Sequence, residues 1–153
     1  MTSFSNLSPL AQNVIQIAKD AGEVIMEIYQ KEGFDKQIKS DNSPLTEADV
    51  CAHGLIMSRL RLLTPEVPIL SEESDLISWK EREKWKEYWL IDPLDGTKEF
   101  ISHNGEFTVN VALIKNHEPI LGVVYAPSLE QTWIGEKGKP AQKITKGKTE
   151  NIQ

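Results

Sequence analysis

Cysteine is nearly absent from this sequence, since Cys51 is the only one among 153 residues. A single cysteine excludes a disulfide within the chain and a cysteine-rich metal framework, and it fits a reducing compartment. No stretch approaches the ~18 apolar residues of a membrane-spanning helix, and the N-terminus lacks the basic and apolar segments of a signal peptide. We therefore expect no integral membrane segment and a cytoplasmic location, with peripheral attachment to the inner membrane as the alternative.

Basic residues are also in short supply, because 17 Lys and Arg face 23 Asp and Glu and the formal net charge is −6. A protein that follows a nucleic-acid backbone normally presents a basic patch, so we expect no nucleic-acid partner. An acidic protein that binds a phosphate must recruit cations to hold it. The composition, 39% hydrophobic and 26% charged, is that of a globular protein, and this length suits one domain with a sizeable core.

Two amphipathic helices are predicted in the first half of the chain. Apolar residues recur in steps of three and four over residues 7–28, and Ser8 followed by Pro9 marks the start of the first helix. The segment "LTEADVCAHGLIMSRLRLLTP" predicts a second helix, which Pro65 stops. In this second helix Cys51, Leu55, Ser58 and Leu62 fall on one face, so we interpret Cys51 as an inert buried thiol.

Strands are predicted where short apolar runs end at turn residues. "VPILSEES" and "EYWLIDPLDG" both end abruptly in acid, and residues 106–114, 120–127 and 131–135 predict an antiparallel meander of three strands. Helices and strands do not alternate strictly, which favours an α+β layered fold with two helices packed on a mainly antiparallel sheet. We expect residues 1–136 to form this domain and residues 137–153, rich in Lys and Gly, to form a polar tail.

Four carboxylates follow the two acid-terminated strands, Glu72 and Glu73 after the first and Asp92 and Asp95 after the second. If the strands are neighbours in one sheet, these ends meet, and each like-charged pair costs ~4 kcal/mol at 4 Å and an effective dielectric of about 20. Divalent cations remove that cost. Oxygen ligands without His or Cys favour Mg²⁺ or Mn²⁺ over zinc.

The segment Asp92-Pro93-Leu94-Asp95-Gly96 has features that suit a metal and a phosphate together. Pro93 stiffens the turn, so that both aspartates and the Leu94 carbonyl can face one spot. Gly96 permits an unusual backbone conformation, and a helix that begins at Thr97 would offer main-chain N–H groups to an anion. Two simpler interpretations stay open: Asp-Pro-x-Asp-Gly is also a good surface turn, and Glu72-Glu73 is also a solvated strand edge.

A further acidic residue, Asp49, lies in "SPLTEAD". Thr46 and Asp49 have the spacing of a capping box at the start of the second helix, and that role alone would explain them. The functional alternative is that Asp49 helps to activate the water that attacks phosphorus, through a hydrogen bond shared with Thr97.

In order and spacing, "SPLTEADVCAH", "PILSEES", "WLIDPLDGTKEFI" and "NGEFTVNVALI" followed by "PILGVVYAP" resemble the N-terminal part of the lithium-sensitive, Mg²⁺-dependent phosphatases that include the inositol monophosphatases. "DPLDGTKEF" is most similar to the 3'(2'),5'-bisphosphate nucleotidases of the CysQ type. The resemblance implies the layered sugar-phosphatase fold and a small nucleoside bisphosphate as substrate, with 3'-phosphoadenosine 5'-phosphate hydrolysed to AMP and phosphate.

The resemblance also implies two or more Mg²⁺ ions and a role for each motif residue. Glu72, Asp92 and the Leu94 carbonyl would hold one ion, and Asp92 with Asp95 the second. Glu72, Leu94, Asp95, Gly96 and Thr97 would surround the phosphate, with Gly96 and Thr97 contacting it through main-chain N–H groups. Glu72, Asp49 and Thr97 are the implied catalytic residues, and Glu73 would support them from behind.

Members of that family continue for roughly another hundred residues, with a motif that supplies a further metal-binding aspartate. We therefore expect this chain to be truncated and weakly active or inactive alone, and its bare apolar face to favour self-association. Two alternatives remain: an inositol- or sugar-phosphate phosphatase, and a non-catalytic metal-binding fragment.

Overall fold

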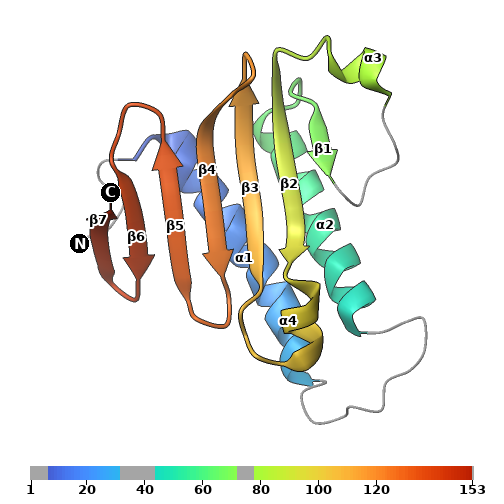
Figure 1. The fold of residues 1–153 in the computed structure, drawn as a ribbon, viewed down its shortest axis with the longest axis vertical. Helices are drawn as coiled ribbons and strands as arrows, with labels where there is room; N and C mark the ends of the chain where they lie inside the picture. Colours follow the sequence, from blue (N-terminus) through green and yellow to red (C-terminus); the bar gives the residue numbers. More distant parts are fainter. Residues whose placement is uncertain (1–6, 32–43, 72–77, 153) are drawn as a thin grey trace.

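Seven strands form one sheet in which neighbours in the sheet are also neighbours along the chain, from β1 to β7 (Figure 1). The computed structural model describes residues 7–31, 44–71 and 78–152. The helices are α1 (Pro9–Lys31), α2 (Pro44–Leu63), α3 (Trp79–Arg82) and α4 (Thr97–Ser102). The strands are β1 (Ile69–Ser71), β2 (Glu87–Asp95), β3 (Thr108–Lys115), β4 (Glu118–Ala126), β5 (Gln131–Glu136), β6 (Ala141–Thr145) and β7 (Lys148–Ile152).

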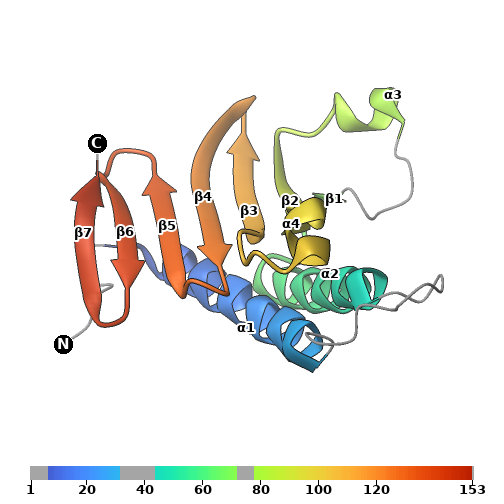
Figure 2. The same ribbon diagram turned by 60° about the horizontal axis from the view of Figure 1, so that its bottom comes forward.

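The predicted α+β architecture is confirmed. Helices α1 and α2 lie side by side on one face of the sheet (Figure 2). Strands β1 and β2 are parallel, and every later pair is antiparallel, so the sheet is mainly antiparallel as expected. The core lies between the helices and the sheet, where Trp89, Ile91, Val109, Val111 and Val123 are almost fully buried.

Helix α1 follows the predicted apolar stripe, and its start is capped as the sequence indicates. The backbone N–H of Ala11 donates to Ser8 Oγ over 3.1 Å, and Pro9 occupies the first helical position. The Ser8 hydroxyl in turn donates to the Glu136 carboxylate at the end of β5. This contact ties the beginning of the helix to the sheet that it covers.

Helix α2 turns a different face inward from the one predicted. Its buried residues are Ala48, Ala52, Ile56 and Leu60, at steps of four, whereas Cys51 is exposed and Leu62 is 81% exposed. The interpretation of Cys51 as a buried thiol was therefore wrong. The large apolar side chains misled the prediction, because alanines allow α2 to pack closely and carry little signal in the hydrophobic pattern.

The polar tail expected at residues 137–153 is instead a hairpin of the same sheet. Strand β6 pairs with β5, and β7 pairs with β6. Gln142 and Ile144 alternate inward and are buried, and Gly147, with φ 63°, makes the tight turn between the two strands. These two buried side chains pack β6 beside the edge of the sheet. They are too few to give a recognisable strand pattern in a Lys-rich sequence.

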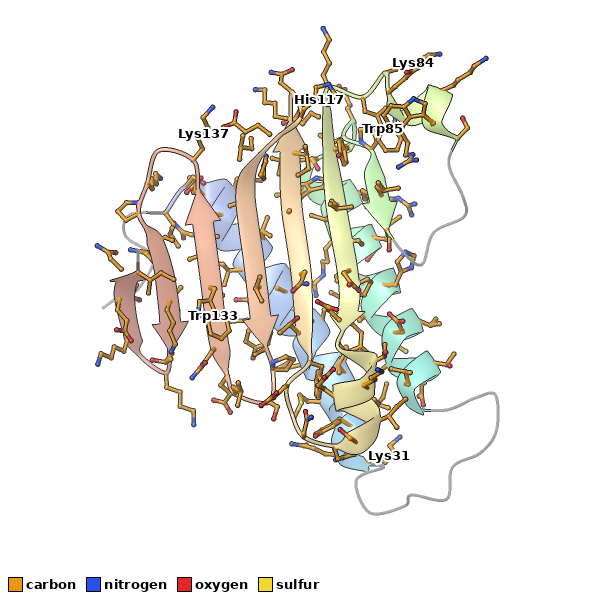
Figure 3. All side chains as sticks on the ribbon, viewed as in Figure 1. Lys31, Lys84, Trp85, His117, Trp133 and Lys137 are labelled. Atoms are coloured by element: carbon orange, nitrogen blue, oxygen red, sulfur yellow. The ribbon has the colours of Figure 1, made fainter. Side chains whose placement is uncertain are left out.

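The second face of the sheet is covered by neither long helix (Figure 2). Strand register aligns Asp92, Asn110, Val124, Trp133 and Lys143 in one row across it. Figure 3 shows Trp133 on this face, with the Lys143 ammonium 5.8 Å from its ring centroid. We call this surface the open face.

Candidate metal and phosphate site

Strands β1 and β2 bring the two acid-terminated segments to the same edge of the sheet. Their parallel pairing sets Ile69 opposite Trp89 and Ser71 opposite Ile91, the residue before Asp92. These two strands are therefore neighbours in one sheet, which is the condition on which the expected meeting of their acidic ends depends. Glu72 and Glu73 follow Ser71 in the sequence but lie outside the described residues, so the roles expected for them stay predictions.

The two aspartates lie on a bulge at the end of β2. Asp92 pairs with Asn110 and Asp95 pairs with Thr108, so two residues of β2 oppose a single residue of β3 between these pairs. The bulge contains Pro93, which has no N–H to give to the ladder. Pro93 is buried, Asp92 is half-buried and Asp95 is exposed. The bulge therefore places two carboxylates at the rim of the open face.

Gly96 connects the bulge to α4 in the left-handed conformation, with φ 98° and ψ 52°. A Cβ added here would also lie 3.1 Å from Phe107 Cα, so the position needs glycine for its dihedral angles and for space. No side chain caps the start of α4. Because the first N–H groups of a helix have no acceptor within it, those near Thr97 can meet an anion.

An aromatic cluster packs α4 against the end of α1. The Tyr29 ring near the end of α1 stacks on His103 with centroids 3.9 Å apart, and it contacts Phe107 edge-on at 4.8 Å. Phe100 of α4 packs against Phe107 at 5.3 Å. Burial raises the pKa of Tyr29, and a hydrogen bond with the Gly105 backbone partly opposes this. The cluster joins α1 to α4, a role that the sequence did not reveal for His103.

Asp49 lies in α2 near the same end of the sheet. Helix α2 begins at Pro44, so Thr46 is already inside its first turn and not at the capping position, which argues against the capping box. Figure 1 shows α4 beside the first turns of α2, and the two helices are in contact. Asp49 is half-buried. The hydrogen bond expected between Asp49 and Thr97 stays a prediction.

Sequence and structure comparisons agree with this geometry. The model of the inositol monophosphatase family matches residues 6–152, almost the whole chain. The chain belongs to the inositol monophosphatase family. It is 53% identical, over 85% of its length, to the 3'(2'),5'-bisphosphate nucleotidase CysQ of Escherichia coli K12, of which it covers 53%. It is 47% identical to the protein of the same name from Aggregatibacter actinomycetemcomitans, covering 49% of that protein.

Solved structures share the fold. The crystal structure of CysQ from Bacteroides thetaiotaomicron superposes on 92% of this chain with a TM-score of 0.81 and 42% identity, and half of that structure is covered. The SuhB protein of Bartonella henselae gives a TM-score of 0.71 at 28% identity. The chain thus spans about half the length of the relatives it matches, and the resemblance expected from its motifs is confirmed.

The metal chemistry of the family fits the donor atoms at this site. Two carboxylates and the main-chain carbonyl of Leu94 lie within four residues, and all are hard oxygen donors that suit Mg²⁺. Among residues 7–31, 44–71 and 78–152 no group of three His, Cys, Asp or Glu side chains is arranged to hold a metal ion. The third carboxylate of the predicted set, Glu72, lies outside those ranges.

Asn110 is the site residue that sequence reasoning missed. It lies opposite Asp92 in the β-ladder, and its Nδ2 donates to Asp95 Oδ2 over 3.1 Å. Asn110 therefore pairs in register with one aspartate of the bulge and hydrogen-bonds the other. The only signal in the sequence is a polar residue within the alternating run "EFTVNVALI", and strand register, which the sequence does not provide, is needed to interpret it.

A hollow lies elsewhere on the molecule. It has a volume of about 750 Å³ and lies between α1 and the ends of β4 to β6, with Glu23, Tyr125, Thr132 and Lys146 among its lining residues. None of the predicted site residues that the structure describes lines it. Its walls mix both signs of charge.

In the described chain no helix is both long and apolar enough to cross a bilayer.

Proposed function

We propose that this protein acts as a Mg²⁺-dependent phosphatase on a small nucleoside bisphosphate, converting 3'-phosphoadenosine 5'-phosphate to AMP and phosphate in the cytoplasm. One observation carries the proposal: the β2 bulge presents Asp92, Leu94 and Asp95 immediately before a left-handed glycine and an uncapped helix start. Cation ligands and anion donors are therefore adjacent along the chain. The relatives at about half identity, named 3'(2'),5'-bisphosphate nucleotidases, support the substrate.

In this proposal the acidic residues hold the cations. Glu72, Asp92 and the Leu94 carbonyl bind one Mg²⁺, and Asp92 with Asp95 binds a second. When bound, the ions would lower the pKa of a water molecule and neutralise charge on the phosphoryl group. Glu73 supports Glu72 without binding the ion itself.

The remaining residues orient the reactants. The main-chain N–H groups of Gly96 and Thr97 hold the phosphate, helped by the short α4 helix behind them. Asp49 accepts the proton of the attacking water, while the Thr97 hydroxyl fixes the direction of that water. The contact between α2 and α4 supports this part of the proposal, because it brings the elements that carry Asp49 and Thr97 together.

We further propose that the 153-residue chain alone turns over slowly. Asp95, Thr97 and Lys98 are exposed, so water reaches the site from one side, and a closed site strengthens every electrostatic interaction within it. The test is a phosphate-release assay with 3'-phosphoadenosine 5'-phosphate, run beside the Escherichia coli CysQ protein. A kcat on the order of 10 s⁻¹, typical of enzymes, would contradict slow turnover by this chain.

A second candidate is an inositol- or sugar-phosphate phosphatase, which the matching family model favours. The same assay with inositol 1-phosphate separates the two. We expect faster release from the nucleotide; faster release from the inositol phosphate would select the second candidate. Metal binding with no release from either substrate would instead indicate a metal-binding fragment.

A further inference from the structure

Asn110 is built into the open face beside the two aspartates. Its neighbours in β3, Val109 and Val111, point into the helix-covered core and are buried. Because side chains alternate along a strand, Asn110 points to the other face, where its ladder partner Asp92 also lies. Opposed residues of antiparallel strands have Cα atoms about 5 Å apart. Asn110 and Asp92 are thus directly opposed residues on the same face of the sheet.

The chemistry of the neighbouring carboxylate fixes the orientation of the amide. An ionised carboxylate can only accept hydrogen bonds, so the NH₂ end of Asn110 must face Asp95. The structure shows this arrangement, with Nδ2 donating to Asp95 Oδ2 over 3.1 Å. This bond occupies one oxygen of Asp95 and restrains the side chain, which leaves its other oxygen for a different partner.

The other end of the amide is buried without a partner. Asn110 Oδ1 is closed to solvent and accepts no hydrogen bond from the residues that the structure describes. A buried acceptor without a donor is unfavourable, and the opposite orientation would set two acceptors against each other at Asp95. Oδ1 therefore requires a donor or a cation, and a hydrated cation beside the aspartates supplies one.

We propose that Asn110 is a positioning residue for the metal site: its Nδ2 holds Asp95 in the orientation that binds the cation, and its Oδ1 completes its hydrogen bonding when the hydrated cation is present. This rests on the proposed function, which places Mg²⁺ at Asp92 and Asp95. Residues that orient metal ligands from outside typically change metal affinity by about 10- to 100-fold when they are replaced.

The test is a titration with Mn²⁺, a spectroscopic stand-in for Mg²⁺, followed by the electron paramagnetic resonance of the free ion. It compares the wild-type chain with Asn110→Leu, an apolar replacement of similar volume. We expect the dissociation constant of Asn110→Leu to rise about 10-fold or more. Asn151→Leu is the matched control, because it removes an amide from β7 that bonds Gln142, outside the row of site residues; its affinity should match wild type.

A second readout separates positioning from a purely structural role. In EDTA the unfolding midpoint of Asn110→Leu should stay close to that of wild type, because the loss of the hydrogen bond to exposed Asp95 is offset by the removal of a buried oxygen without a partner among the described residues. A loss of affinity accompanied by an equal loss of metal-free stability would overturn the proposal. If Asn110→Leu does not fold, Asn110→Ala is measured in the same way, with the same expectations.

The wild-type titration distinguishes a failure of the role proposed for Asn110 from a failure of the proposed metal site. Wild-type binding that Asp95→Asn abolishes and Asn110→Leu leaves unchanged would reject the role of Asn110 and keep the metal site. Failure of the wild-type chain to bind Mn²⁺ at millimolar concentration would remove the metal site itself, and the role of Asn110 with it.

Discussion

The two faces of the sheet differ in what they contribute. On the helix-covered face, Trp89, Ile91 and Val111 are almost completely buried beneath α1 and α2. On the open face, Leu90 is 41% and Val124 37% exposed, and the row of Val124 also carries Asp92 and Asn110. Both faces are built from the same strands, with side chains that alternate between them.

Within a strand, the residues that stabilise the fold therefore lie on one face, and the polar residues available for binding lie on the other. Burial of apolar area on the covered face supplies most of the folding free energy, at roughly 25 cal/mol per Å². Carboxylates gain nothing from such burial and stay at the rim, where a cation and a phosphate can reach them. Substitutions on the covered face should therefore change the free energy of unfolding, and those on the open face should change binding.

The largest effect on stability is expected at Trp89. Its side chain is fully buried, and its Nε1 donates to Thr64 Oγ1 over 2.8 Å. Trp89→Ala should lower the free energy of unfolding by about 4 kcal/mol, because it leaves a cavity and removes the hydrogen bond to the Thr64 hydroxyl. Trp133→Ala on the open face should cost about 1 kcal/mol or less. Urea denaturation measures both, and equal losses would remove the distinction between the faces.

Two helical glycines offer a smaller test with opposite signs. A Cβ at Gly22 of α1 would lie 2.5 Å from the Tyr125 ring and 3.2 Å from Pro127 Cβ, whereas nothing lies within 4 Å of one at Gly54 of α2. Gly22→Ala should destabilise the protein by about 1–2 kcal/mol through overpacking. Gly54→Ala should stabilise it by up to about 1 kcal/mol through helix propensity. Thermal unfolding gives both values, and a stabilising Gly22→Ala would show that α1 does not approach the sheet so closely.

The shifted pKa of Glu136 makes the free energy of unfolding depend on pH. Burial alone would raise the pKa of Glu136, but hydrogen bonds from Ser8 and the Lys139 ammonium at 3.4 Å outweigh it and lower the pKa. A lowered folded-state pKa contributes stability above the ordinary value of 4.5, and this contribution is lost as the pH falls through the folded-state pKa.

The matching variant is Glu136→Gln. It should cost about 1–2 kcal/mol at pH 7, as expected for hydrogen bonds to a charged group, and the difference from wild type should shrink as the solution is acidified below pH 4.5. Urea midpoints across this range give the comparison. A difference that stays constant with pH would mean that the Glu136 charge does not hold the start of α1.

The smallest effect on stability is expected at Leu90, on the open face. Leu90→Lys should change the free energy of unfolding by less than about 1 kcal/mol and weaken any self-association through the open face. Sedimentation velocity at increasing concentration compares the variant with wild type. A wild-type chain that stays monomeric at high concentration would exclude the proposed self-association.

The sequence predicted the two long helices and the meander because each depends on a local pattern. The stripe of α1 and the Ser8-Pro9 start required no tertiary information. The inward face of α2 was mispredicted because Ala48 and Ala52 bury little area, so their pattern is weak. The strands after residue 140 were missed because an existing sheet edge, which the local composition does not encode, stabilises them.

The site was predictable to the extent that its residues are contiguous. Asp92 to Thr97 form one motif, and the left-handed Gly96 and short α4 were expected from it. Asn110 was not, because its role depends on the bulge that shifts the register between β2 and β3. The stacking of His103 on Tyr29 likewise joins residues far apart in the chain.

The account depends on a cation at the β2 bulge, and paramagnetic broadening by Mn²⁺ in the NMR spectrum of the labelled chain tests that location directly. At substoichiometric Mn²⁺ we expect the amide signals of residues 92–97 and of Asn110 to broaden first, and Asp92→Asn to abolish the effect. Signals that broaden uniformly would contradict a metal site at the bulge. So would signals that broaden instead around the carboxylates of the hollow beside α1, which are Asp20, Glu23, Glu27 and Glu130.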